Sequence, residues 1–272
     1  MTDLINSAPK FDRPPVIETR IAVQFEPLSN LQVGHFGLFW QECLGTTAWQ
    51  ILQDQPAVPR ESEQFGAKRL RPNKTRIDMS VPPVCMRLAR GKERTVQLQP
   101  DRLTYSWNRE NRERPSYEVV KREFDELYGA FEVFTRKWLL RPPVPNLWQL
   151  TYVNAIPQEA LWKVPSDWRR VLSGIFPDEG FDTGPYEWAT FDGTWYFVIP
   201  DERGRVRVKI QKAVREGSDD VVLLLILRAQ GELDRDRSGD WASELDVGHG
   251  AIVELFNRLG SDEAKTHWGL KK

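Results

Sequence analysis

The chain has 272 residues, of which 40% are hydrophobic and 28% charged, and its formal net charge is −1. These proportions are typical of a globular protein and exclude a largely disordered chain. Two cysteines are too few for a disulfide framework, the first residues lack the apolar stretch of a signal peptide, and no apolar run is long enough to span a bilayer. We therefore expect a soluble, cytoplasmic protein with no membrane association.

The charge is unevenly distributed along the chain. Residues 60–100 carry ten Lys and Arg against four Asp and Glu, whereas residues 177–272 carry thirteen against nineteen. A segment this basic can attract polyanions although the whole chain is nearly neutral. The alternative is that these charges only keep one surface solvated.

Apolar residues predict the elements of the first half. Alternation predicts a strand over 16–25, and spacings of three and four residues predict a helix over 31–52. Residues 53–75 show neither period. Short strand patterns, separated by Pro and Gly, then occupy residues 76–81, 84–89, 94–99 and 103–107. The clearest helical stripe of the chain covers 116–140.

A proline-rich bridge at 142–145 precedes a second series of elements. Alternation predicts a strand over 147–156, and residues 165–175 are typical of a short helix. Four more strands are predicted over 188–191, 195–199, 206–214 and 221–227, the first two joined by a turn at Asp192-Gly193. The last strand is apolar throughout, as in the centre of a sheet, and a final helix is predicted over 241–259.

The order of strand, helix, about four strands and long helix therefore occurs twice. We predict an α+β fold in which two such units, 14–141 and 146–272, follow a flexible leader at 1–13. The units form one extended antiparallel sheet with helices on one side, in the element order of TATA-binding-protein-like domains. Two ferredoxin-like units side by side are the alternative, and neither fold assigns a function by itself.

The sequence contains no fingerprint of a common catalytic site. The three histidines, His35, His249 and His267, are isolated in sequence, and no nucleophile elbow, Walker loop or dinucleotide-binding pattern occurs. A helical histidine is usually a hydrogen-bonded packing residue, although His35 and His249 could meet as general bases. We expect no metal, no cofactor and no catalytic residues.

The basic segment around residues 68–76 is the best candidate for binding nucleic acid. Flexible clusters of Lys and Arg make the phosphate contacts that such binding needs. The candidate residues are Lys68, Arg69, Arg71, Lys74, Arg76, Arg90 and Lys92. A solvated loop is the alternative.

The hairpin at 97–108 is the best candidate for a surface that recognises a protein partner. Long polar side chains alternate along it, and we select Gln97, Gln99 and Arg102, with Arg109 beyond its end. The alternative is a solvent-facing edge of the sheet, where such alternation is also common.

Several short motifs are distributed over most of the chain. They are Pro14-Pro15-Val16-Ile17-Glu18, His35-Phe36, Phe39-Trp40, Gln97-Leu98-Gln99-Pro100-Asp101-Arg102, Trp107-Asn108-Arg109, Tyr117, Phe124, Thr151-Tyr152-Val153-Asn154, His249 and Leu255-Phe256. Together they resemble the sporadTIGR family, a sporadically distributed group of uncharacterised bacterial proteins, although Ser261 stands where that family tends to have threonine. The resemblance implies no established activity, cofactor or catalytic residue. The patchy occurrence of the family implies accessory or defence genes.

We therefore expect a non-catalytic recognition or adaptor protein. Its partner would be a protein encoded by a neighbouring gene in a bacterial accessory or anti-phage defence locus. Nucleic-acid recognition through residues 60–100 is the alternative function, and an enzyme is the third.

Overall fold

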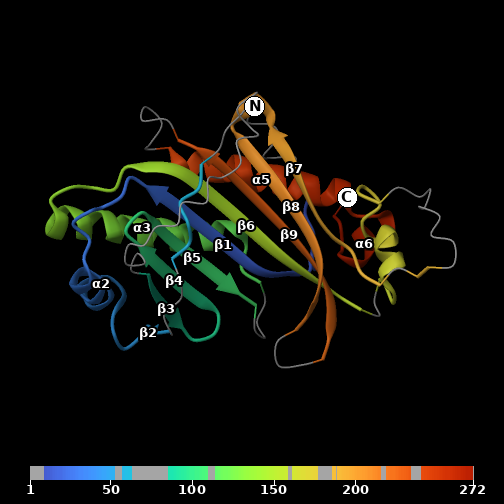
Figure 1. Ribbon diagram of the computed structural model, residues 1–272, viewed down its shortest axis with the longest axis horizontal. Helices are drawn as coiled ribbons and strands as arrows, with labels where there is room; N and C mark the ends of the chain where they lie inside the picture. Colours follow the sequence, from blue (N-terminus) through green and yellow to red (C-terminus); the bar gives the residue numbers. More distant parts are fainter. Residues whose placement is uncertain are drawn as a thin grey trace.

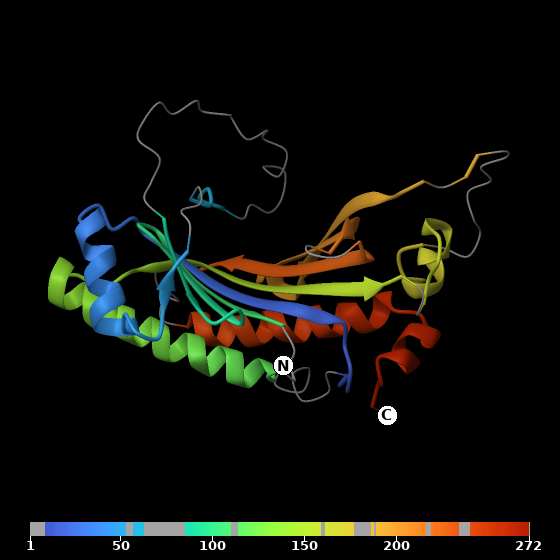
Figure 2. The same ribbon diagram turned by 90° about the horizontal axis from the view of Figure 1, so that it is seen from below.

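Nine strands form one antiparallel sheet, and two long helices lie along one side of it (Figures 1 and 2). The computed structural model describes residues 9–52, 57–62, 85–109, 114–158, 161–176, 186–187, 189–215, 219–233 and 240–271. The strand order is β2-β3-β4-β5-β1-β6-β9-β8-β7. The predicted α+β class and the antiparallel sheet are confirmed. Within the described residues, no helix has both the length and the apolar character needed to cross a membrane.

The elements have the following bounds. The strands are β1 (Val16–Phe25), β2 (Gln50–Ile51), β3 (Met86–Arg90), β4 (Arg94–Gln99), β5 (Arg102–Asn108), β6 (Pro145–Pro157), β7 (Asp192–Ile199), β8 (Gly204–Val214) and β9 (Val221–Glu232). The helices are α2 (Val33–Phe39), α3 (Tyr117–Leu139), α4 (Trp168–Val171), α5 (Trp241–Leu259) and α6 (Asp262–His267).

The centre of the sheet is the pair formed by β1 and β6. β1 pairs with β5 on its other side, and β6 pairs with β9. Apolar side chains of these strands, among them Ile21, Val23, Trp148 and Leu150, are fully buried. They form one hydrophobic core together with α3 and α5. One sheet and one core therefore contain strands from both the 14–141 and the 146–272 segments.

The helix predicted over 31–52 is shorter in the structure. α2 ends at Phe39 and is followed by a single π-helical turn, Trp40–Leu44. Gly45 then adopts φ of 83°, a left-handed conformation that favours glycine and ends the helix. Residues Gln50–Ile51 leave the helical path and pair with β3 as the edge strand β2.

The second half also differs from its prediction in three places. The short helix predicted over 165–175 is a 3₁₀ turn, Pro165–Asp167, followed by only one turn of α4. Asp192-Gly193, predicted as a turn, begins β7, because both residues pair with β8 along a continuous ladder. Of the strand predicted over 188–191, the described residues 189–191 are not in a strand. The strand predicted over 76–81 lies outside the described residues.

Candidate binding site

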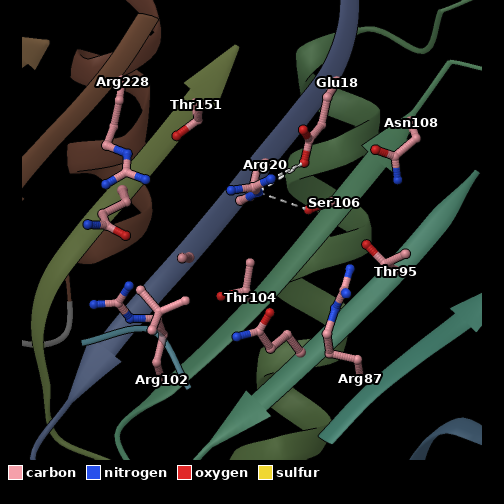
Figure 3. Close-up of a pocket in the computed structure, with 14 residues that line it drawn as sticks. Glu18, Arg20, Arg87, Thr95, Arg102, Thr104, Ser106, Asn108, Thr151 and Arg228 are labelled. Atoms are coloured by element: carbon pink, nitrogen blue, oxygen red, sulfur yellow. Dashed lines mark hydrogen bonds and ion pairs between the residues drawn. The ribbon is translucent and has the colours of Figure 1, made fainter. Parts of the chain in front are cut away.

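The two faces of the sheet have different chemistry. Along β1, the buried Ile21 and Val23 alternate with Arg20, Ala22 and Gln24, as the period of two of a strand requires. Arg20 points away from α3 and α5, which lie behind the sheet in Figure 3, and Ala22 and Gln24 share its face because they lie two and four positions further along the strand. We name this side the polar face, and its residues include Arg20, Gln24, Arg87, Thr95, Gln97, Gln99, Arg102 and Arg228.

A cavity of about 370 Å³ lies on the polar face. Its lining includes four guanidinium groups, which belong to Arg20, Arg87, Arg102 and Arg228 (Figure 3). These side chains come from β1, β3, β5 and β9, so the cavity spans the joint between the two halves of the sheet. The site therefore depends on pairing between strands that are distant in sequence.

The neighbouring strand β8 extends this positive surface. Arg207 lies directly opposite Arg228 in the β8–β9 ladder, and residues directly opposite each other share a face. Arg205 and Lys209, two positions away on either side, lie on the same face because strand side chains alternate. With the four arginines of the cavity, these three make seven cationic side chains on the polar face, a distribution that attracts anions.

Residues 57–62 are docked on the polar face. This segment, cyan in Figure 2, lies on the side of the sheet away from α3 and α5. The amide of Gln99 accepts a hydrogen bond from the N–H of Val58 and donates one to its carbonyl, both at 3.0 Å. The amide of Gln24 likewise accepts a hydrogen bond from the N–H of Glu61, at 2.9 Å, and donates one to the carbonyl of Glu61, at 3.0 Å. Each glutamine amide thus satisfies the main-chain donor and acceptor of one residue of the segment.

Two further residues orient these glutamines. Gln97 donates to Oε1 of Gln99 at 2.7 Å, and Nη2 of Arg102 donates to Oε1 of Gln24 at 2.9 Å. Arg102 also donates to the carbonyl of Pro59 at 3.3 Å. Because each amide is held by a second polar group, its donor and acceptor ends are fixed before the segment binds.

The carboxylate of Glu61 lies between the buried guanidinium group of Arg102 and the half-buried one of Arg228. Its oxygens lie 3.1 and 3.3 Å from Nη1 of Arg228, and one of them lies 3.6 Å from Nη1 of Arg102. The side chain of Arg102 is only 4% exposed. Burial lowers the pKa of both arginines, and the charge of Glu61 opposes that shift. Since arginine stays protonated in proteins, this carboxylate compensates two charges that have lost most of their water.

Three of the four residues predicted to bind a partner lie together here. Gln97, Gln99 and Arg102 belong to the network that holds residues 57–62. Arg109 does not: it follows β5 and lines a different cavity, whose lining also includes Tyr117.

The residues predicted to bind nucleic acid are divided. Lys68, Arg69, Arg71, Lys74 and Arg76 lie outside the described residues. Arg90 pairs with Arg94, whose guanidinium binds Glu123 of α3, so Arg90 lies on the helix side of the sheet. Its guanidinium is 5.2 Å from the ring centre of Trp49. Lys92 lies in the turn between β3 and β4. Neither residue lines the cavity on the polar face described above.

Sequence reasoning did not select Arg20, Gln24, Glu61 or Arg228. Arg20 and Gln24 alternate with apolar residues of β1, and that alternation was a signal for a second, polar face. Glu61 had no such signal. It lies in a stretch with neither a helical nor a strand pattern, and its partner Arg228 is 167 residues further along the sequence.

A second cavity, of about 1090 Å³, lies on the helix side, between α3, α5 and the residues before β1. The ring of Tyr117 stacks on that of His249, with centroids 4.0 Å apart. Nδ1 of His249 is 2.8 Å from the hydroxyl of Tyr152. Tyr117 and Lys121 both donate to Asp246 of α5, at 2.9 and 2.7 Å. This network joins α3 to α5 and β6, which gives His249 a packing role. His35, by contrast, accepts from the N–H of Gln32.

Burial lowers the pKa of His249 to about 4, with Glu118 and Asp246 opposing the shift and Arg114 and Lys121 adding to it. An unfolded histidine has a pKa of about 6.5. Below that pH the unfolded chain binds a proton that the folded chain refuses, so the free energy of unfolding falls between pH 6.5 and 4. We expect a loss of roughly 3 kcal/mol across this range.

This pH dependence can be assigned by mutation. Urea unfolding at several pH values should show it in the wild type and in His267→Gln, because His267 is exposed. His249→Gln should remove most of it. An unchanged pH dependence in His249→Gln would assign the loss to another group.

Among the described residues, no three His, Cys, Asp or Glu side chains gather as metal ligands. Comparisons with models of protein families, with curated proteins and with solved structures found no match to this chain. The resemblance to the sporadTIGR family stays a prediction, and the function must be inferred from the polar face itself.

Proposed function

We propose that this protein is a non-catalytic recognition component that binds a protein partner on the polar face. The observation that carries the proposal is the paired-glutamine contact: Gln24 and Gln99 each bind both main-chain groups of one residue of the docked segment, while Arg102 and Arg228 bind its carboxylate. Main-chain contacts supply affinity for any extended peptide, and side-chain pockets supply selectivity. These are the two requirements of peptide recognition.

The biological setting is also a proposal. We propose a cytoplasmic protein that acts with the product of a neighbouring gene, in a bacterial accessory or anti-phage defence locus. The resemblance to the sporadTIGR family is the support for this setting. The geometry of the polar face supports only the binding of a partner.

Site-specific photo-crosslinking tests the proposed function. A photoreactive amino acid at Thr95, on the polar face beside Gln97, should form a defined adduct with the partner in the native host. The same amino acid at Val133, an exposed position of α3 that is 64% accessible, is the matched control and should not. We expect Arg228→Gln to lower the Thr95 adduct at least tenfold. Equal labelling from Thr95 and Val133 would contradict the proposal.

Nucleic-acid binding is the second candidate, and the seven cations of the polar face favour it. Each lost phosphate contact lowers the slope of log affinity against log salt by about 0.9 on duplex DNA. Replacing Lys68, Arg69, Arg71 and Lys74 by Gln should therefore weaken binding to all sequences and reduce the slope by up to about four.

A second set of substitutions distinguishes binding by the basic segment from binding by the polar face of the sheet. Replacing Arg205, Arg207 and Lys209 by Gln should reduce binding if the polar face is the binding surface. Fluorescence anisotropy with duplex and single-stranded oligonucleotides at two salt concentrations measures both sets. No binding by the wild type at low salt would end this candidate.

We also propose that the two halves arose by duplication, in the order of TATA-binding-protein-like domains. β1 and β6 each begin a half and pair with the last strand of that half, β5 and β9. Each half also contains one long helix, α3 or α5, after its last strand. The described second half has three strands between β6 and α5, where the first has four between β1 and α3.

A further inference from the structure

The docked segment 57–62 has the properties of a bound peptide. Its main chain is held at Val58 and Glu61, three residues apart, by side chains of the sheet. Both main-chain groups of each residue bond to the side-chain amide of a single glutamine, Gln99 at Val58 and Gln24 at Glu61. The segment is thus an intramolecular example of what the polar face can hold.

The anchor of the segment is electrostatic. Glu61 supplies a carboxylate to Arg228 and Arg102, and both guanidinium groups keep a buried Nε with no hydrogen-bond partner among the described residues. Arginine presents its donors as a planar fork that matches a carboxylate. The pair is therefore built to select an acidic side chain at one position of the bound segment.

The segment is also weakly attached. Val58, Pro59, Arg60 and Ser62 are exposed, and only Ala57 and Glu61 are half-buried. Among the described residues it is held by hydrogen bonds and ion pairs, and segments with few buried apolar contacts open at low cost. A competing peptide can replace these contacts one for one.

We propose that the polar face recognises a segment of its protein partner that carries an acidic side chain at one position, and that residues 57–62 are an internal copy of this ligand that the partner displaces. The inference rests on the proposed function and adds to it the chemistry of the ligand and its regulation. A tethered segment acts at an effective concentration in the millimolar range, so it suppresses a weaker ligand in solution strongly. The partner must therefore bind more tightly than the internal copy or remove it first.

The test uses the full-length protein and a fluorescent peptide with the sequence of residues 57–62, Ala-Val-Pro-Arg-Glu-Ser, capped at both ends. We expect this peptide to bind the Glu61→Gln protein at least tenfold more tightly than the wild type, because the internal copy has lost its anchor. The same peptide with Gln in place of Glu should bind both proteins weakly. Glu254→Gln, on the exposed side of α5, is the control and should behave as the wild type.

A second variant and two measurements distinguish loss of binding from loss of folding. Arg228→Gln combined with Glu61→Gln should abolish peptide binding, and circular dichroism and thermal unfolding establish that each variant is folded. Equal affinity of the peptide for wild type and Glu61→Gln would overturn the internal competition. If no folded variant binds the peptide, the proposal that the polar face recognises a segment with an acidic side chain is wrong.

Two further outcomes separate the inference from the proposed function. If the Thr95 adduct forms but the peptide with the sequence of residues 57–62 does not compete with it, the partner binds the polar face and the inference alone fails. If neither the adduct nor the peptide complex forms, both fail. Binding of an oligonucleotide in place of the peptide by Glu61→Gln would overturn the inference and support the second candidate function.

Discussion

We expect Gly248→Ala to lower the free energy of unfolding by about 2 kcal/mol, although alanine is the better helix former. α5 packs on β6 at this residue. A Cβ at position 248 would lie 2.8 Å from Cη2 of Trp148, closer still to Cζ3, and 3.2 Å from the Cβ of Ala229. Trp148 is fully buried, so its ring cannot move aside, and the helix must shift away from the sheet.

The matched control is two residues along the same helix. A Cβ at Gly250 meets nothing within 4 Å, so Gly250→Ala should raise the free energy of unfolding by about 0.5–1 kcal/mol. Urea unfolding at pH 7 measures both variants. The close packing of α5 on Trp148 predicts opposite signs. A Gly248→Ala variant as stable as Gly250→Ala would show that α5 is not pressed against β6.

Strong periodicity made several elements predictable. The final helix was predicted over 241–259 and has these bounds, and the strand over 94–99 matches β4. The long helix α3 differs by one residue at each end from its prediction over 116–140. In these elements one apolar face packs against the core, so the sequence pattern directly reflects burial.

Other elements depend on interactions that no local pattern contains. The helical spacing after residue 31 continues past Gly45, but the chain turns there and Gln50–Ile51 pair with β3. Asp192-Gly193 is a favourable turn sequence, yet the ladder with β8 holds it in a strand. In both cases pairing with distant residues overrides local preference.

The binding site was only partly predictable for the same reason. Gln97, Gln99 and Arg102 were selected because they alternate on one hairpin, and they do lie together on the polar face. Arg109, one residue beyond the hairpin, lines the other cavity. Arg228 and Glu61 meet only because β9 is brought beside β6 and β1 by the whole sheet. Such a pair requires the tertiary structure.

The largest effect is expected from separating the two halves. We expect residues 1–141 and 142–272, produced as separate chains, to aggregate or to lack a cooperative unfolding transition. β1 and β6 pair along nearly their whole length at the centre of the sheet. Separation exposes both as edges, which invite pairing with other chains, and it opens the core around Trp148 and Leu150 to water.

The helix side gives the same expectation. Tyr117 and Lys121 of α3 bind Asp246 of α5. The ring of Phe124 packs edge-on against that of Trp241, with ring centroids 5.3 Å apart. Neither separate half can make these contacts. Co-expression should restore a soluble one-to-one complex, because the strands can pair without a covalent link, and size-exclusion chromatography with circular dichroism measures this. If each half is instead a folded monomer that ignores the other, the halves are independent domains. The cavity shared by Arg20, Arg102 and Arg228 would then lose its structural basis as a binding site.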